Sequence, residues 1–178
     1  MPAEKTQASL SGRANTNESP STQVFEIYIK ASAQAVWEAI TNPEWSAKYG
    51  YQGSMHYELR PGGKFEARAN EGMRKMGLPE IIIDGEVLES VPPRRLVQTY
   101  RWLFNEQHKA EGFTRVTFEI EQTPAGFSRL TVTHELEGAP MMAAATRSKF
   151  DLQGSGGWNW ILSDLKSLLE TGKIMSAS

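Results

Sequence analysis

The chain has 178 residues, of which 39% are hydrophobic and 22% charged, a composition typical of a single globular domain. Its formal net charge of -2 lacks the basic excess that a non-specific binder of nucleic acid or of anionic membranes needs. It contains no cysteine, which excludes disulfides, thiolate metal sites and cysteine nucleophiles, and no apolar run approaches the ~18 residues of a membrane span.

The first segment, residues 1–21, is rich in Ser, Thr, Asn and Ala, with Leu10 as its only branched apolar side chain. Such a segment buries too little apolar surface to offset its ordering entropy, which predicts a disordered leader. It also lacks the continuous apolar region of a secretory signal, and a chain without cysteine suits a reducing compartment, so we expect a cytoplasmic protein. We expect one folded domain over residues 22–173 and a short tail over residues 174–178.

Apolar and polar residues alternate over residues 22–29, which predicts a strand. Ser32 stands where a helix N-cap belongs, and apolar residues recur at helical spacing over residues 35–40. Because a proline disfavours helical backbone in the residue before it, Asn42 is predicted to end this helix. Pro43 then suits the first position of a second short helix.

The middle of the chain consists of short alternating segments separated by turn residues, which predicts consecutive antiparallel strands. Gly62-Gly63, Pro92-Pro93 and the turn at Pro124 are the clearest breaks. Carboxylates mostly lie opposite the apolar residues of their own strand, as on an exposed face. The six predicted strands cover residues 54–59, 64–68, 81–89, 96–102, 113–122 and 127–136.

The last element is a predicted helix whose apolar residues form one stripe from Trp158 to Leu169, with Gly172 as its stop. Together these elements predict an α+β fold, in which a curved antiparallel sheet of about seven strands wraps on the long C-terminal helix. Two short helices follow the first strand in this arrangement.

The order and spacing of several strings resemble the SRPBCC or START-like superfamily, whose members share the helix-grip fold. Within it, the chain most resembles the family named for the activator of the heat-shock protein ATPase. Glu58 departs from the aspartate that relatives often carry, and residues 70–80 do not align. The matching strings are AVWEAITNPE at 35–44, LRPGGKF at 59–65, GEVLE at 85–89, PPRRLV at 92–97, LTVTH at 130–134 and GW at 157–158.

The resemblance implies a deep cavity between the concave face of the sheet and the C-terminal helix, where relatives hold lipids, hormones, polyketides or other apolar molecules. Strand parity places aromatic and aliphatic side chains on that face, where they either line a pocket or fill the core. No cofactor is expected. The residues expected to line the cavity are Phe65, Leu96, Tyr100, Trp102, Val116, Phe118, Leu130, Val132, His134, Trp158, Ile161, Leu162 and Leu165.

His134 shares a strand face with Leu130 and Val132, so it is expected near the cavity. An imidazole there can act as a general acid or base, or it can be a core histidine held by a backbone carbonyl; the second interpretation is favoured because no orienting partner is visible. The other two histidines, His56 and His108, lie on separate elements, and no pair has the spacing of a zinc site, so no metal is expected.

Residues 70–79 carry two methionines between glycines, which leaves open a lid over the cavity and an ordinary loop, the latter favoured. Three functions remain at this point. The first is a binding protein for a small apolar ligand, and the second is a cyclase- or hydrolase-type enzyme that uses His134 or a cavity tyrosine. The third is a co-chaperone that stimulates a heat-shock protein ATPase through its surface. The expected partner is a small apolar ligand and not nucleic acid, and a protein partner or a second copy is left open.

Overall fold

The computed structural model describes residues 21–147 and 156–175. Residues 1–20 of the predicted leader and residues 176–178 of the predicted tail therefore lie outside the described residues. The same holds for Gly154 and Ser155 of the GSGG string at residues 154–157. The predicted domain boundaries thus stay predictions.

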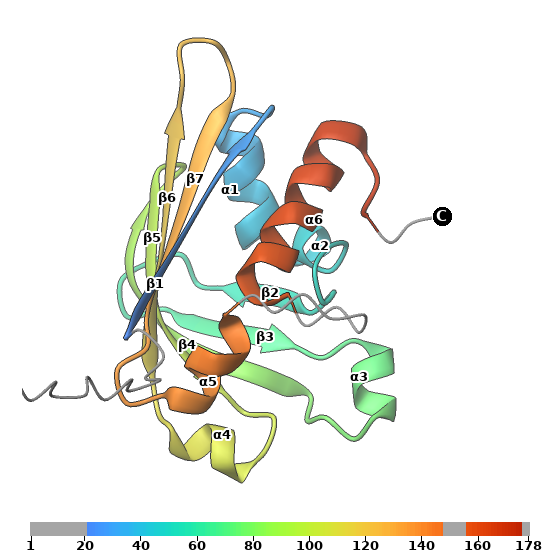
Figure 1. Ribbon diagram of the computed structural model, residues 1–178, viewed down its shortest axis with the longest axis vertical. Coiled ribbons are helices and arrows are strands. Elements are labelled where there is room, and N and C mark those ends of the chain that lie inside the picture. The colour runs from blue at the N-terminus through green and yellow to red at the C-terminus, as the bar shows by residue number, and fades with distance from the viewer. Residues whose placement is uncertain (1–20, 148–155, 176–178) are drawn as a thin grey trace, which may run out of the picture.

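Seven strands form one antiparallel sheet in the order β1-β7-β6-β5-β4-β3-β2, as the alternating patterns predict (Figure 1). The first strand pairs with the last one, and every other strand pairs with its neighbour in sequence. This is the helix-grip arrangement of a curved sheet that holds a C-terminal helix. The strands are β1 (Thr22–Ile29), β2 (Ser54–Tyr57), β3 (Lys64–Arg68), β4 (Ile81–Val91), β5 (Arg95–Trp102), β6 (Thr114–Gln122) and β7 (Ser128–Glu135).

Three predicted helices lie on the concave face of the sheet: α1 (Ala33–Thr41), α2 (Pro43–Ser46) and α6 (Gly157–Thr171) (Figure 1). Ser32 caps α1 as predicted, since its hydroxyl oxygen accepts a hydrogen bond from the backbone N–H of Ala35 at 3.2 Å. None of the helices in the described part has the length and apolarity that crossing a membrane would require.

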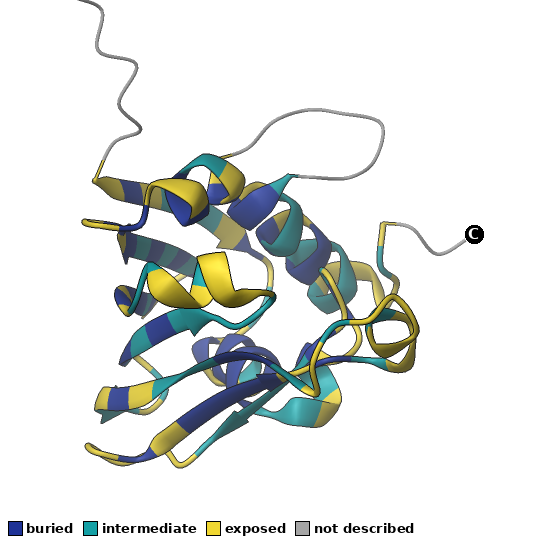
Figure 2. Ribbon diagram, turned by 90° about the horizontal axis from the view of Figure 1, so that it is seen from below, coloured by how far each residue is buried: buried dark blue, intermediate teal, exposed yellow. Residues whose placement is uncertain are grey.

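Three further short helices are α3 (Glu71–Lys75), α4 (Glu106–Ala110) and α5 (Pro140–Thr146). The segment that holds α3 was interpreted as a lid or a loop, and α4 was not predicted. Asparagine caps begin both of them: the side-chain oxygen of Asn70 accepts from Met73 N and that of Asn105 accepts from His108 N, each at 2.9 Å. Most of α4 is exposed (Figure 2).

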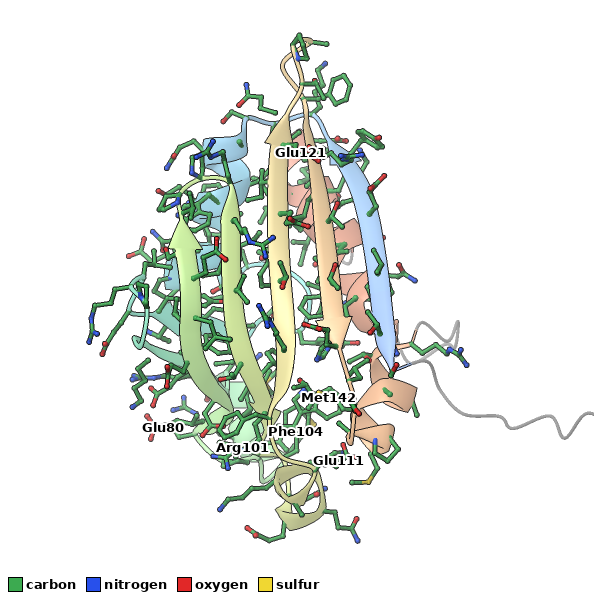
Figure 3. The ribbon with its side chains drawn as sticks, turned by 90° about the vertical axis from the view of Figure 1, so that its left-hand side faces the viewer. Glu80, Arg101, Phe104, Glu111, Glu121 and Met142 are labelled. Carbon is green, nitrogen blue, oxygen red and sulfur yellow. The ribbon has the colours of Figure 1, made fainter. Side chains whose placement is uncertain are left out.

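The outer face of the sheet is charged, and its side chains are paired across strands (Figure 3). Two of these residues are less exposed than the alternating pattern indicates. Glu66 is only 5% exposed, because Lys64 and Arg68 bind its carboxylate from both sides and keep its pKa below the usual value. Arg101 has the outward parity of β5, yet it is partly buried in a two-bond ion pair with Asp84 at 2.7 and 2.9 Å.

Candidate ligand site between the sheet and the last helix

The residues predicted to line the cavity do lie together on the inner face of the sheet and on α6. The strand register aligns Leu96, Phe118 and Val132 across three neighbouring strands, and it aligns Val116 with His134 in the next row. All thirteen predicted lining residues are buried except Trp102 and Ile161, which are half-buried. Parity along the strands was therefore enough to place these side chains on one face.

The described residues also form two open hollows, and none of the thirteen predicted residues lines either of them. One, of about 450 Å³, lies on the outer face between Leu88 and Phe113. The other, of about 360 Å³, lies where the β6–β7 turn meets the end of α6, near Phe127 and Lys166. The cavity between sheet and helix therefore stays a proposal, and its support has to come from the side chains that face that space.

His134 is fully buried, and both of its ring nitrogens are hydrogen-bonded. The indole N–H of Trp158 donates to Nδ1 at 3.1 Å, so Nδ1 is the acceptor and Nε2 carries the proton. Nε2 then donates to the Thr114 hydroxyl at 2.8 Å, and that hydroxyl donates to the carbonyl of Tyr100 at 2.8 Å. The ring therefore ties α6 to three strands of the sheet.

Burial lowers the pKa of His134 to about 3, so its imidazole is neutral at any physiological pH. A proton-transfer role would also require His134 to break its bond with either Trp158 or Thr114. The arrangement thus supports a role in positioning α6, and acid–base work by this residue remains the untested alternative.

Gln98 was not among the predicted site residues, although it faces the same space. It lies on β5 between Leu96 and Tyr100 in the inward-facing parity and is 1% exposed. Its side-chain oxygen, Oε1, has no hydrogen-bond partner among the described residues. A buried amide oxygen without a partner costs about 1–3 kcal/mol, so it calls for an explanation. The sequence does carry a signal for Gln98, because it is a polar residue at an inward position of an otherwise apolar strand face.

A row of stacked aromatic rings runs along the inner face from β2 through β3 to Tyr100 on β5, the strand that carries Gln98. Tyr57 stacks on Phe65 with ring centroids 4.6 Å apart, and Phe65 stacks on Tyr100 at 6.1 Å. Burial raises the pKa of Tyr57 well above its usual value, and the nearby Tyr49 and Tyr100 raise it further, while a hydrogen bond from Gln98 lowers it. Burial likewise raises the pKa of Tyr100 to about 12. These phenols therefore stay protonated and can act as hydrogen-bond donors or acceptors.

The histidines do not come together. His56 lies on the outer face of β2 beside Ser54, with the hydroxyl oxygen 3.0 Å from Nε2, and His108 lies on α4. Among the residues that the structure describes, no three His, Asp or Glu side chains are grouped closely enough to hold a metal ion.

Comparison with known proteins gives a family profile and a fold. A profile described as "Activator of Hsp90 ATPase homolog 1-like protein" matches residues 30–170. No curated protein matches the chain.

Solved structures share the fold at low sequence identity. DynU16, described as a putative protein in the dynemicin biosynthetic locus, is 22% identical with a TM-score of 0.62, over 87% of this chain and 49% of its own. The protein MLL2253 from Mesorhizobium loti is 20% identical with a TM-score of 0.60, over 83% and 96%. The Aha1 dimer from Colwellia psychrerythraea is 21% identical with a TM-score of 0.58, over 85% and 98%.

Proposed function

Because this chain belongs to the family of activator of Hsp90 ATPase homolog 1-like proteins, we propose that it is a cytoplasmic binding protein that holds a small, mostly apolar molecule between the sheet and α6. The observation that carries the proposal is the buried oxygen of Gln98, which has no partner among the described residues. A ligand that donates a hydrogen bond to this oxygen would satisfy it, and such a bond would orient the ligand in an apolar site.

The surroundings of Gln98 indicate what else the ligand must offer. The rings of Tyr57, Phe65 and Tyr100 stack in a row on the inner face of the sheet, and Phe118 and Trp158 meet edge to face at 5.9 Å. Such walls favour a molecule with a broad apolar surface. One hydroxyl or N–H group on that surface would match the amide oxygen.

Two matched probes test this proposal by thermal shift and by fluorescence titration: 2-naphthol, which has a hydroxyl donor, and 2-methoxynaphthalene, which has none. A probe that binds only the folded state must raise its melting temperature. We expect 2-naphthol to bind the Gln98→Leu variant about 10-fold more weakly than the original protein, because one buried hydrogen bond is lost. The affinity for 2-methoxynaphthalene should be the same for both proteins. Equal affinity of both proteins for 2-naphthol, or no saturable binding, would contradict the proposal.

A cyclase- or hydrolase-type enzyme that uses the same space is the first alternative. Both nitrogens of His134 are engaged in hydrogen bonds, so a cavity tyrosine is the other candidate for the acid–base group. With its pKa raised to about 12, Tyr100 is better suited to donating a hydrogen bond than to accepting a proton at neutral pH. This is why we place binding before catalysis.

Stimulation of a heat-shock protein ATPase, the activity in the description of the family, is the second alternative. Addition of the purified chain to Hsp90 in a coupled ATPase assay tests it. A rise in the ATPase rate that saturates with added chain would favour it over the binding of a small molecule.

We also propose that the chain pairs with a second copy of itself. The relative from Colwellia psychrerythraea, which matches 85% of this chain, is described as a dimer in solution. Light scattering on the purified chain over a concentration series tests this directly.

A further inference from the structure

The two edges of the sheet differ in how open they are. At one edge, β2 has only four residues, all of them half-buried. At the other edge, β1 has eight residues, TQVFEIYI, with one charged side chain and no proline. Val24 is 62% and Tyr28 49% exposed on its outer side. A long apolar edge strand of this kind is prone to pair with a further strand.

The hydrogen bonds of β1 show which of its backbone groups are open. Leu136 N donates to Ser21 O at 2.6 Å, so Ser21 and every second residue after it turn their N–H and C=O groups toward β7. The residues in between turn theirs away from the sheet. Near the end of the strand α6 occupies these groups, since Lys166 Nζ donates to Tyr28 O at 2.6 Å and Lys30 N donates to Glu170 at 2.8 Å.

Apart from the N–H of Tyr28, the remaining outward groups belong to Thr22, Val24 and Glu26. Within the described ranges, no residue forms a hydrogen bond with their backbone N–H or C=O. These three residues are centred on Val24, so the open stretch of the edge is symmetrical about the most exposed apolar residue of the strand.

We infer that the edge of β1 pairs antiparallel with β1 of a second copy, with the twofold axis at Val24. In this register Val24 lies opposite its own counterpart, and Thr22 lies opposite Glu26 of the second copy. All the open groups of Thr22, Val24 and Glu26 are then used, in about six hydrogen bonds between the two strands. The two sheets become one continuous sheet, and the exposed valines cover each other.

Registers shifted toward the end of β1 would need a backbone carbonyl that already has a partner. An axis at Phe25 would pair Thr22 with Tyr28, and an axis at Glu26 would pair Val24 with Tyr28, so both need the Tyr28 carbonyl that Lys166 already binds. An axis at Glu26 would also set two carboxylates opposite each other, which is destabilising. The axis at Val24 needs neither group.

This inference rests on the self-association proposed above, and the variants are chosen so that the two can fail separately. Val24→Pro removes one outward N–H without touching the bonds to β7, whereas Val24→Thr keeps that N–H and the branched shape. We expect Val24→Pro to weaken dimerisation roughly 100-fold, because two symmetry-related hydrogen bonds are lost, and Val24→Thr to leave a dimer. Circular dichroism checks that each variant is folded. If Val24→Pro does not fold, Val24→Asp, which sets two carboxylates against each other at the axis, takes its place.

Crosslinking then tests the register, since the chain has no cysteine of its own. In a hydrogen-bonded antiparallel pair the Cα atoms are about 5.5 Å apart, which a disulfide can bridge. Val24→Cys should therefore form a disulfide-linked dimer on mild oxidation. Glu26→Cys should not, because its counterpart lies about 13 Å further along the strand.

The outcomes separate cleanly. A monomer at every concentration would overturn both the self-association and its surface. A dimer that persists unweakened in Val24→Pro or its replacement would overturn the β1 edge alone. Crosslinking at Glu26 in place of Val24 would overturn the register.

Discussion

Two glutamines lie buried on the inner face of the same sheet, and they differ in what their amide groups meet. Gln23 on β1 donates to the carbonyl of Ala143 at 2.8 Å and accepts from the hydroxyl of Thr146 at 3.1 Å. Gln98 on β5 is more deeply buried, yet its oxygen has no partner among the described residues. The first amide joins β1 to α5, whereas the second is available to a ligand.

This contrast predicts that the same substitution has unequal effects on stability at the two positions when no ligand is present. Gln23→Leu should lower the free energy of unfolding by about 2 kcal/mol, because it removes the buried hydrogen bond to the Ala143 carbonyl, whereas the Thr146 hydroxyl keeps the Met142 carbonyl as its acceptor. Gln98→Leu should change it by less than about 1 kcal/mol, because an unsatisfied oxygen is removed together with the weaker interaction with Tyr57. Urea denaturation of both variants measures the difference. A loss at Gln98 as large as that at Gln23 would show that Gln98 is needed for folding and would remove the main support for a ligand at that oxygen.

His134 makes stability depend on pH. Its pKa is about 3 in the folded protein and about 6.5 in the unfolded chain, so between these values only the unfolded state takes up the proton. Stability is therefore complete above pH 6.5 and falls as the pH drops toward 3, by about 1.4 kcal/mol per pH unit.

The variant His134→Gln keeps groups that can accept from Trp158 and donate to Thr114 but cannot titrate. Between pH 7 and pH 5 we expect the original protein to lose about 2 kcal/mol more than this variant. The comparison also cancels the contribution of His56, whose pKa is lowered by burial and by Arg68. Equal losses in urea unfolding at the two pH values would mean that His134 is not held neutral.

At the scale of elements, α6 is fixed to the rest of the fold by a buried carboxylate. Asp164 is 1% exposed, and its two oxygens accept from Gly50 N at 2.8 Å and from Met175 N at 2.6 Å. These bonds join the helix to the α2–β2 connection and to the chain that follows α6.

Asp164→Asn keeps the shape of this side chain but replaces one acceptor oxygen with a donor that faces a backbone N–H. We expect a loss of about 2–3 kcal/mol in the free energy of unfolding, measured by urea denaturation. Glu38→Gln on the exposed side of α1 is the control and should stay within about 0.5 kcal/mol. A similarly small effect at Asp164 would contradict this account of how α6 is held.

The start of α6 depends on a glycine. Gly157 has a φ of 54°, and a Cβ on it would lie 2.2 Å from the carbonyl oxygen of Thr146, at the end of α5. Gly172, at the other end of the helix, has a φ of 75°, but a Cβ there would meet nothing within 4 Å.

We therefore expect Gly157→Ala to lower the melting temperature much more than Gly172→Ala. The second variant carries only the backbone cost of a left-handed residue, about 1–2 kcal/mol, whereas the first must also separate α5 from α6. Differential scanning calorimetry of the two variants measures this. Equal shifts would show that α5 and α6 can move apart freely.

The sequence predicted the elements that carry strong periodicity and missed those that depend on local caps. The seven strands and α6 follow from alternation and from the apolar stripe at Trp158 to Leu169. In contrast, α3 and α4 have five residues each and no buried side chain, so periodicity could not reveal them. Their Asn70 and Asn105 caps were the available signal.

At the scale of the whole molecule, the face that a residue occupies could be predicted, but its partners could not. Parity placed His134 and the aromatic residues on the inner face, and the resemblance supplied the fold and the family that the profile confirms. Trp158 and His134 are 24 residues apart in the chain. The hydrogen bond between them therefore depends on how α6 packs across the sheet. The same holds for the side-chain oxygen of Gln98, whose lack of a partner among the described residues depends on what packs around it.

A crystal structure of the protein with 2-naphthol tests the central claim most directly, because it shows where an apolar molecule with one donor binds. Our account predicts the naphthol rings between the inner face of the sheet and α6, with the hydroxyl within about 3 Å of the Gln98 oxygen. Binding only in the outer hollow between Leu88 and Phe113, with the space beside Gln98 filled by side chains, would contradict it.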